Sequence, residues 1–527
     1  MNTLAVSADA PARADLVDDV ARLLREAMAL YESDAASLDT LRMHAQRLVE
    51  PLRVAIAGMV KAGKSTLLNA IIGEEIAPTD TGECTRVITW YRYAVSPRVM
   101  MYPTEGQPRR LPIIRVDKRL HFDIGELRAD QVARIEVFWP APALRTITLI
   151  DTPGIASLSA DVSERSTRFL TPDDEKSEAD AIVYLMRHMH ASDLRFLEAF
   201  RDSSAGMSAT INALAVLSRA DEIGAGRIDS LLSAREIADR YRHDDTLRSL
   251  SLGVVPMAGL LAQSARTLRQ SEFRALQSLA ALDRNNRELL LISADRFCRP
   301  NGAVGVDVDT RRALLQRFGM FGVRLALVML RSGIDDADEL ARALARRSGL
   351  DDLLKLIAVQ FEARSALLRA RSAIGALDDI LQRHRRAGSD DLRASVERVR
   401  SNAHDFQELR LLATLRTEPV SLTPQLIEEA ERLLGAEGVD DRSRLGLHDD
   451  FPEIDPRTAA LEHLARWRSM QQNPTSERAL SAVCSTVVRT CEGIVANSPE
   501  GAPRQRTRLV LAAEPRPGSG QEARNQA

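Results

Sequence analysis

The chain has 527 residues, of which 71 are basic and 74 acidic, which gives a formal net charge of −3. This balance argues against a nucleic-acid-binding or ribosome-linked protein, because such proteins usually carry a strongly basic face. The 45% hydrophobic content allows several packed cores, and 527 residues correspond to about three domains. The chain has only four cysteines, and no two of them have the spacing of a zinc pair, which predicts reduced thiols in a cytosolic protein rather than a disulfide framework or a zinc site.

Short apolar runs dominate the first half of the chain. Helices are predicted over about residues 14–50, where apolar residues recur at three- and four-residue steps, and Pro51 ends this segment. Strands are then predicted at 53–58, 87–93, 99–102, 135–139, 146–151, 181–186, 214–218 and 253–257. Several are apolar at nearly every position, as strands buried on both faces of a parallel sheet must be. This region is expected to form a doubly wound α/β domain with a mixed, mostly parallel sheet.

After residue 259 the pattern becomes helical. Helices are predicted at 260–282, 287–297, 308–331, 337–347, 350–386, 391–415, 423–434, 457–470 and 475–495. The residues from 501 onward are rich in Pro, Gly, Gln and Arg and are expected to be disordered. The predicted organisation is therefore N-terminal helices (1–50), an α/β domain (51–260), an all-α bundle or stalk (261–500) and a tail (501–527).

A phosphate-binding motif follows the strand predicted at 53–58. Gly58-Met-Val-Lys-Ala-Gly63-Lys64-Ser65 fits G-x-x-x-x-G-K-[ST], and a helix is predicted directly after it, so a chance glycine-rich turn is a poor explanation. Glycines let backbone N–H groups turn toward phosphate oxygens, and the helix dipole adds to this. Lys64 is expected to reach the β- and γ-phosphates, and Ser65 to ligate Mg²⁺. The nucleotide contacts predicted here are Gly58, Val60, Lys61, Ala62, Gly63, Lys64, Ser65 and Thr66.

A second metal ligand is predicted at the end of the strand 146–151. Asp151-Thr-Pro-Gly154 places a carboxylate where it can hold the Mg²⁺ shell and a glycine whose N–H can meet the γ-phosphate; alone, it would also fit a plain turn. A threonine before the strand 87–93 is expected to complete the metal shell. Thr85 is preferred and Thr81 is the alternative, while a solvated loop threonine remains possible.

Guanine recognition is predicted at the end of the strand 214–218. Ser218-Arg219-Ala-Asp221 occupies the place of the guanine-reading [NT]-K-x-D element, and Asp221 would accept from guanine N1 and N2, which adenine cannot satisfy. Arg219 would cover the base. Only five of the 71 basic residues are lysine, so arginine is the expected exchange here. Met257-Ala258-Gly259, at the end of the last predicted strand, could supply a backbone N–H to guanine O6.

The runs IAGMVKAGKSTLLNAIIG, APTDTGECTRVITWYRY, DTPG and SRADEIGAGRIDSLLSA together resemble the dynamin superfamily, and in particular the C-type branch of the bacterial isoniazid-inducible dynamin-like GTPases. The resemblance is specific over about residues 51–270. It implies GTP hydrolysis with Mg²⁺, dimerisation across the nucleotide face, and self-association or association with a sister dynamin-like protein. It also implies remodelling or maintenance of membranes by a cytoplasmic protein, peripheral at the inner face of the cell membrane. Helices at 14–50, with parts of 260–300 and 475–495, would form a neck bundle.

The chain departs from the dynamin pattern in the phosphate-binding loop. Dynamins carry a water-orienting glutamine four positions before the phosphate lysine, where this chain has Val60, and Ile155 follows Gly154. Turnover is therefore expected to be low without a partner subunit, and a low-turnover GTP-binding regulatory partner of a sister dynamin-like protein is the alternative function. Lys61 is hypothesised to neutralise charge that develops between the β- and γ-phosphates; the alternative is an exposed lysine folded back on the loop.

Any membrane contact is expected to be peripheral, because the sequence shows no signal-peptide pattern and no run of 18 apolar residues. The candidates are residues 314–330, the basic turn 383–388 and the tail after 501. Arg317 and Arg324 interrupt the first, so a buried helix explains it better. The second is better explained by cations that stabilise a helix C-terminus.

Overall fold

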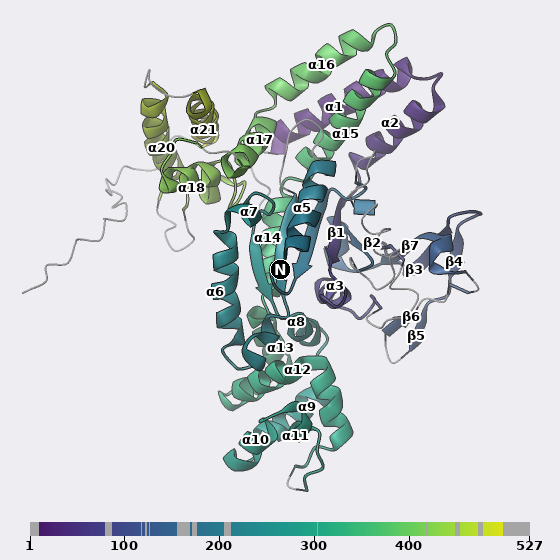
Figure 1. The fold of residues 1–527 in the computed structure, drawn as a ribbon, viewed down its shortest axis with the longest axis vertical. Helices are drawn as coiled ribbons and strands as arrows, with labels where there is room; N and C mark the ends of the chain where they lie inside the picture. The colour runs from purple at the N-terminus through teal and green to yellow at the C-terminus, as the bar shows by residue number, and fades with distance from the viewer. Residues whose placement is uncertain are drawn as a thin grey trace, which may run out of the picture.

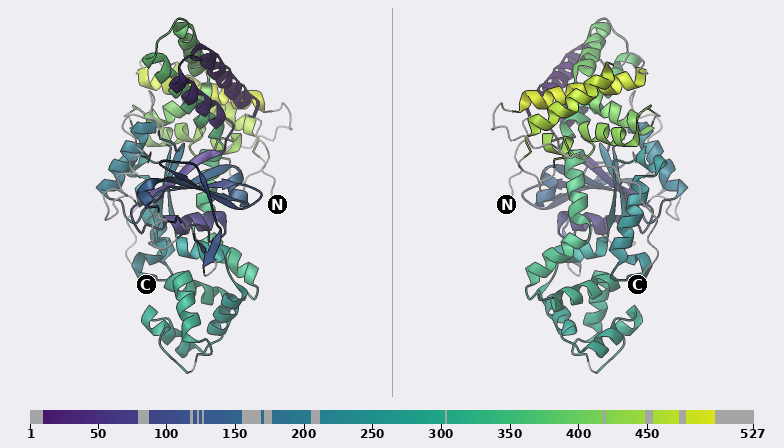
Figure 2. Two further views of the ribbon diagram at one scale, coloured as in Figure 1. Left: turned by 90° about the vertical axis from the view of Figure 1, so that its right-hand side faces the viewer. Right: turned by 90° about the vertical axis from the view of Figure 1, so that its left-hand side faces the viewer.

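The computed structural model describes residues 10–78, 87–116, 119–121, 124–125, 127–154, 169–170, 177–204, 212–302, 304–417, 420–447, 454–472 and 478–498. A central β-sheet lies between two sets of helices (Figure 1). Helices α1, α2 and α15–α21 lie at one end of the molecule, and helices α9–α13 lie at the other. The two side views show the same separation (Figure 2).

The main sheet has nine strands in the order β11-β10-β9-β1-β8-β2-β7-β3-β4. Strands β11, β10, β9, β1 and β8 are parallel, β2 pairs antiparallel with β8 but parallel with β7, and β3 and β4 continue antiparallel. The predicted mixed, mostly parallel sheet is therefore confirmed. The strands are β1 (Leu52–Gly58), β2 (Thr89–Tyr93), β3 (Arg98–Pro103), β4 (Arg109–Leu111), β7 (Val132–Trp139), β8 (Ile147–Asp151), β9 (Ala181–Met186), β10 (Ala213–Ser218) and β11 (Val254–Met257). Strands β5 (Ile114–Val116) and β6 (Arg119–His121), which the sequence pattern did not predict, form a separate two-stranded sheet.

Both faces of the parallel strands are covered, as the doubly wound prediction requires. One face packs on α3 (Lys64–Ile72) and α14 (Leu350–Ile357), and the opposite face packs on α5 (Ala191–Ser204) and α6 (Ser230–Arg242). All seven residues of β1 are buried, which explains its uniformly apolar centre. The carboxyl ends of the five parallel strands therefore meet at one edge, between the helices that cover the two faces.

A helical excursion separates β11 from α14. It comprises α8 (Gly259–Arg266), α9 (Gln270–Ala280), α10 (Arg284–Leu290), α11 (Ala294–Phe297), α12 (Val308–Arg331) and α13 (Ala337–Arg347), which share one core. The helix predicted at 260–282 is thus two helices. The chain leaves and returns at the same point, because the Ala258 N–H donates to the Ser348 carbonyl at 2.8 Å. A Cβ at Gly349 would lie 2.2 Å from the Pro256 carbonyl oxygen, so only glycine fits there.

Helix α14 leads through a π-helical turn (Ala358–Glu362) into α15 (Ser365–Arg383) and α16 (Ser389–Asn402). Helices α15 and α16 share a core with α1 (Ala10–Leu30) and α2 (Ala35–Arg47). The expectation that parts of 260–300 and 475–495 pack with the N-terminal helices is therefore wrong. Those segments belong to two other cores. Amphipathic periodicity predicts an apolar stripe, but it does not identify the partner of that stripe.

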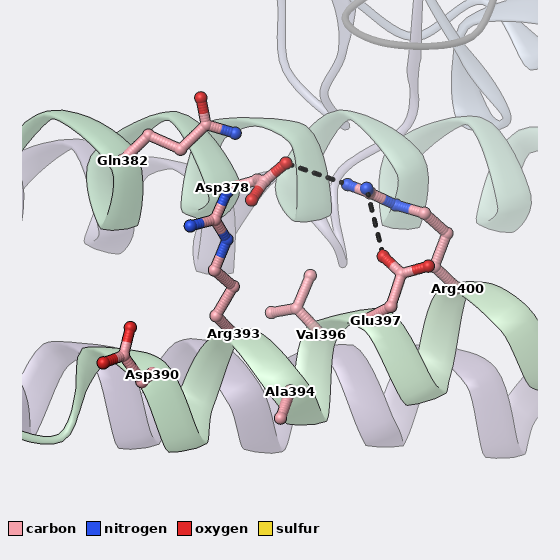
Figure 3. Close-up of a pocket in the computed structure, with 8 residues that line it drawn as sticks. All are labelled: Asp378, Gln382, Asp390, Arg393, Ala394, Val396, Glu397 and Arg400. Carbon is pink, nitrogen blue, oxygen red and sulfur yellow. Dashed lines mark hydrogen bonds and ion pairs between the residues drawn. The ribbon is translucent and has the colours of Figure 1, made fainter.

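The remaining helices form a further core. They are α17 (His404–Thr417), α18 (Pro424–Leu433), α19 (Asp441–Arg444), α20 (Pro456–Gln471) and α21 (Arg478–Asn497). The short α7 (Asp245–Arg248) belongs instead to the core between the sheet and helices α5 and α6. The helix predicted at 391–415 is interrupted at Ala403, which has an extended ψ of 102°. Between α15 and α16 lies a groove lined by charged side chains (Figure 3), in which Arg400 pairs with Asp378 at 3.3 Å and with Glu397 at 3.6 Å.

Two of the segments considered for membrane contact are described. By length and composition alone, α12 and residues 479–497 could cross a membrane, but 56% of the α12 window is buried in a protein core. The turn after α15 packs on the α1–α2 turn: Tyr31 Oη donates to the His384 carbonyl at 2.6 Å, and the Arg386 guanidinium lies 5.0 Å from the Tyr31 ring centre. Both observations favour the structural explanations of these segments. The tail after 501 lies outside the described residues.

Candidate nucleotide-binding site

The predicted phosphate-binding loop joins β1 to α3 at the carboxyl edge of the parallel strands. Its residues Gly58, Lys61 and Gly63 have φ of 143°, 63° and 98°. A Cβ at Gly58 would lie 2.3 Å from the carbonyl oxygen of Leu185 on the adjacent strand β9, so the close approach of the two strands requires glycine. The loop leads straight into α3, whose first amides have no partner within the helix and are available to an anion.

Lys64 and Ser65 form the first turn of α3. The Lys64 Nζ donates to the carbonyls of Gly58 (3.1 Å) and Met59 (3.4 Å), so its side chain folds back across the loop. Burial lowers the pKa of Lys64, and the Asp151 carboxylate partly opposes this effect. Ser65 Oγ donates to Asp151 Oδ2 at 3.2 Å. The structure thus brings together the predicted phosphate lysine and two of the three predicted metal ligands.

Asp151, at the end of β8, has surroundings that fit a divalent cation. Its Oδ1 atom is buried and accepts no hydrogen bond within the described residues. Burial raises the pKa of Asp151 to about 6, although Lys64 and the hydrogen bond from Ser65 both act to lower it. A buried carboxylate oxygen without a donor is costly, and Mg²⁺ takes oxygen ligands. The carboxylate and the Ser65 hydroxyl therefore form a donor set suited to Mg²⁺.

The turn after Asp151 is held against the phosphate-binding loop. Thr152 Oγ1 donates to the Ile56 carbonyl at 3.0 Å, which ties this turn to β1. Gly154 lies so close to the loop that a Cβ there would be 2.6 Å from Cγ2 of Val60. A glycine is therefore required at this position, which packs against the phosphate-binding loop.

Three positions singled out in the sequence lie outside the described residues. These are Thr85, its alternative Thr81, and Ile155. Val60 is described, and its side chain is 45% exposed on the loop but has no polar atom. Among the described residues, the position of the family glutamine therefore offers nothing that could orient a water molecule.

A cavity of about 130 Å³ lies beside the first turn of α3, where a base would sit. Its lining combines the phosphate-binding loop with the ends of β9, β10 and β11, and includes Ala62, Gly63, Thr66, Leu185, Ser218, Arg219, Asp221, Glu222, Met257, Gly259 and Leu260. The structure therefore places four of the predicted base-reading residues, Ser218, Arg219, Asp221 and Met257, around one cavity next to the phosphate-binding loop.

Asp221 and Arg219 both line this cavity. Asp221 is 7% exposed, and burial raises its pKa to about 6. Arg219, with φ of 53°, extends its side chain to the phosphate-binding loop, where Nη2 donates to the Lys61 carbonyl at 2.8 Å. Its Nη1 donates to Glu222 at 2.6 Å. Arg219 therefore crosses from the base-reading turn to the phosphate loop, consistent with the cover predicted for the base. Ser218 instead donates to the Met186 carbonyl on β9 at 3.1 Å.

One predicted contact is not available in this arrangement. Ala258 is fully buried, and its N–H is already donated to the Ser348 carbonyl at 2.8 Å, because the returning excursion packs against this segment. Met257 and Gly259 do line the cavity. The amide of Gly259, the first residue of α8, is therefore the better candidate for a contact with guanine O6. Motif spacing could not distinguish these neighbouring amides, since the competing carbonyl lies 90 positions away in the chain.

Comparisons with known proteins agree with this arrangement. Residues 54–213 match the Dynamin family. Isoniazid-induced protein IniC of Mycobacterium tuberculosis is 40% identical over 450 residues, which cover 85% of this chain and 91% of IniC. This chain belongs to the dynamin superfamily. Within the superfamily it is also similar to isoniazid-induced protein IniA of the same organism, at 35% identity over 21% of this chain and 19% of IniA. Dynamin-like protein 2 of Campylobacter jejuni is 27% identical over 36% of this chain and 29% of its own.

The family assignment confirms the resemblance seen in the sequence, including its isoniazid-inducible branch. The described site contains the phosphate-binding loop, the Lys64 side chain folded across it, and the hydrogen-bonded pair of Ser65 and Asp151. The carboxylate of Asp221 lines the neighbouring cavity. These groups are able to bind a triphosphate, to hold a divalent cation and to distinguish guanine from adenine by its donors.

Proposed function

We propose that this chain binds GTP with Mg²⁺ at the carboxyl edge of its sheet and hydrolyses it to GDP and phosphate. The observation that carries this proposal is the contact between Ser65 and Asp151, whose buried Oδ1 accepts no hydrogen bond from the described part of the chain. Amides of the phosphate-binding loop and Lys64 would hold the phosphates. Ser65, Asp151 and Thr85 would hold the Mg²⁺. When bound, the metal would neutralise charge on the phosphate oxygens.

Base selection is assigned to the cavity beside α3. Its carboxylate, Asp221, would accept the N1 and N2 protons of guanine, and adenine offers no matching donors. Arg219 would cover the base, since its guanidinium already reaches the phosphate-binding loop. Because a buried carboxylate left unpaired by adenine would be penalised, GTP is favoured over ATP.

Turnover by the isolated chain is proposed to be slow. Val60 has no polar side-chain group that could orient a water molecule. The next residue on the loop, Lys61, is exposed and has a left-handed backbone conformation. Lys61 is proposed to neutralise charge between the β- and γ-phosphates. Lys61→Ala should then lower turnover and change its salt dependence. Lys355 is an exposed lysine on α14, and Lys355→Ala should leave both turnover and its salt dependence unchanged. Unchanged turnover and salt dependence in Lys61→Ala would remove Lys61 from the mechanism.

The biological role is proposed to be the remodelling or maintenance of membranes through nucleotide-dependent self-assembly, from the cytoplasm and peripherally at the inner face of the cell membrane. Membership of the dynamin superfamily supports this proposal. The similarity to IniA, also an isoniazid-induced protein, supports a sister dynamin-like chain as a partner. Valine at position 60, in place of the water-orienting glutamine of dynamins, favours one alternative function: a low-turnover GTP-binding regulator of that sister protein.

The test is liposome co-sedimentation combined with phosphate release, with and without GTP. Lipid-stimulated turnover supports the leading proposal, whereas tight GTP binding without turnover supports the regulatory alternative. Lys64→Ala should weaken GTP binding at least about tenfold, the effect of losing one charge-assisted contact, while Lys355→Ala should leave it unchanged. If the wild-type chain shows no saturable, magnesium-dependent uptake of labelled GTP, both functions are wrong.

A further inference from the structure

Helix α12 is broken where it passes the base cavity. Gly319, inside this helix, has φ of 64° and ψ of 173°, a conformation that side-chain-bearing residues avoid. The break is accommodated by α8, because Ser264 Oγ donates to the carbonyl of Arg317, just before the break. A Cβ at Gly319 would lie 3.7 Å from Asp221 Oδ2. The break therefore places α12 backbone directly beside the base-reading carboxylate.

The turn that carries Asp221 rests on α12. This turn (Ala220–Ala225) is followed by Gly226, which is buried and has φ of 69°. A Cβ at Gly226 would lie 3.5 Å from the Asp221 carbonyl oxygen and 3.8 Å from the Phe321 nitrogen of α12. The backbone of α12 thus packs on the end of this turn. A hydrogen bond from Arg324, 98 positions further along the chain, also reaches the Gly226 carbonyl.

Arg324 is the side chain that fixes this contact. Its Nη1 donates to the Gly226 carbonyl at 2.6 Å, and its Nη2 donates to the Leu291 carbonyl at 2.7 Å. Its Nε also donates to the Leu291 carbonyl, at 3.2 Å. One planar guanidinium therefore joins the base-reading turn to the turn between α10 and α11. A lysine, with a single nitrogen, cannot reproduce this fork.

Arg317, which precedes Arg324 in α12, is engaged elsewhere. Arg317, before the break, pairs with Glu75 after α3 and with Glu272 of α9, and its Nη2 donates to Thr267 Oγ1 at 2.8 Å. Within the described residues, the hydrogen bonds of Arg324 go to the carbonyls of Gly226, Leu291 and Ile292, and none goes to the phosphate-binding loop or to Asp151. Replacing Arg324 should therefore change the affinity for the base and leave the affinity for the phosphates unchanged.

We propose that Arg324 is a positioning residue for guanine recognition: it holds the turn that carries Asp221 at the depth where the carboxylate meets the guanine edge. The inference rests on the proposed function, because it takes Asp221 as the base reader. It predicts that guanine selectivity can be lost while phosphate affinity is kept.

The experiment measures the affinities of GTP, ITP and ATP for the full chain with Mg²⁺, by competition against a fluorescent GTP analogue. ITP lacks the 2-amino group of guanine, and ATP lacks both donors that Asp221 would accept. Arg324→Ala should weaken GTP binding about tenfold, the loss expected when one charge-assisted contact no longer holds the carboxylate in place. ATP affinity should stay within about twofold, so the GTP-to-ITP and GTP-to-ATP ratios both fall. Arg312→Ala is the matched control, because Arg312 is an exposed arginine of the same helix that pairs with Asp309 at 2.6 Å.

Two further variants separate positioning from folding. Arg324→Lys keeps the charge and should lower the GTP-to-ITP and GTP-to-ATP ratios less than Arg324→Ala does. If Arg324→Ala is too unstable to measure, the fall of both ratios in Arg324→Lys relative to the wild type tests the same role. In an Asp221→Ala background, Arg324→Ala should no longer change the GTP-to-ATP ratio, because the two residues act through one contact. Equal losses of GTP and ATP affinity, unchanged ratios, or additive effects in the double variant would overturn the role of Arg324. A wild-type chain without guanine preference would instead defeat the proposed function, and the inference with it.

Discussion

Replacing Asp151 by asparagine is expected to stabilise the nucleotide-free protein and to abolish its metal-dependent response to GTP. The reason is the desolvated carboxylate at the end of β8, whose Oδ1 accepts no hydrogen bond in the described structure. Asparagine has nearly the same shape but no charge to desolvate. A residue needed for binding is thus predicted to reduce the stability of the empty protein.

The size of the effect follows from the pKa of Asp151. It rises from 3.8 to about 6 on folding, so at neutral pH the folded state is penalised by about 3 kcal/mol, at about 1.4 kcal/mol per pH unit. This value already includes the attraction to Lys64 and the hydrogen bond from Ser65, which lower the pKa. Because the folded pKa is the higher one, the penalty is complete above about pH 6 and disappears below about pH 4. At pH 5 about half of it should remain.

The assay is chemical denaturation of wild-type and Asp151→Asn protein without nucleotide, at about pH 7.5 and about pH 5. Asp130 is an exposed aspartate of the same domain, so Asp130→Asn is the control and should leave the free energy of unfolding unchanged at both pH values. In a second arm, Mg²⁺ and GTP should raise the unfolding midpoint of the wild type but not that of Asp151→Asn, since only a ligand bound to the folded state stabilises it.

The reasoning is refuted if Asp151→Asn is less stable than the wild type at about pH 7.5. It is equally refuted if the gain in stability does not shrink at about pH 5, because a gain independent of pH cannot arise from desolvation of a carboxylate.

Three further predictions concern Asp221, Asp180 and Gly349. The GTP-to-ATP affinity ratio should be constant above about pH 6 and fall about tenfold per pH unit below it, because protonated Asp221 cannot accept the N1 proton; a ratio independent of pH in a titration of competition binding would exclude this role. Asp180→Ala should lower the free energy of unfolding by about 3–5 kcal/mol, since it strands the buried guanidinium of Arg47, 2.6 Å from Asp180; an unchanged urea midpoint would contradict this. Gly349→Ala should destabilise more than Gly333→Ala: both glycines have positive φ, but only at 349 would the Cβ strike a backbone carbonyl of β11, so equal losses in thermal melts would point to backbone strain alone.

Local sequence signals predicted the elements well where caps and apolar runs coincide. The helices at 308–331 and 337–347 begin and end as predicted, and each follows an aspartate, Asp307 or Asp336, whose side chain accepts a hydrogen bond from the first turn. The strand 181–186 also has the predicted bounds, because its six residues are apolar and buried. These features depend on near neighbours in the chain, which a single sequence displays.

Features that depend on distant residues were not predictable. Nothing local indicates that the amide of Ala258 is taken by Ser348, or that a glycine within the apolar helix 308–331 adopts a helix-breaking conformation beside Asp221. Likewise, the apolar stripe of the N-terminal helices does not reveal that its partners are α15 and α16. The motifs for phosphate, metal and base could be located in the sequence, whereas the contacts that hold them in place belong to the tertiary fold.

The excursion from β11 to α14 has a consequence for how this molecule can change over evolution. Its two ends are joined by the hydrogen bond from Ala258 to Ser348, so the chain leaves the α/β domain and re-enters it at one point. Insertions or deletions within residues 259–347 leave the strand order and the connection to α14 untouched. Helix α8 of this segment lines the base cavity, and α12 lies beside Asp221. Related chains can therefore acquire a different nucleotide response through changes in residues 259–347, while the sheet is inherited unchanged.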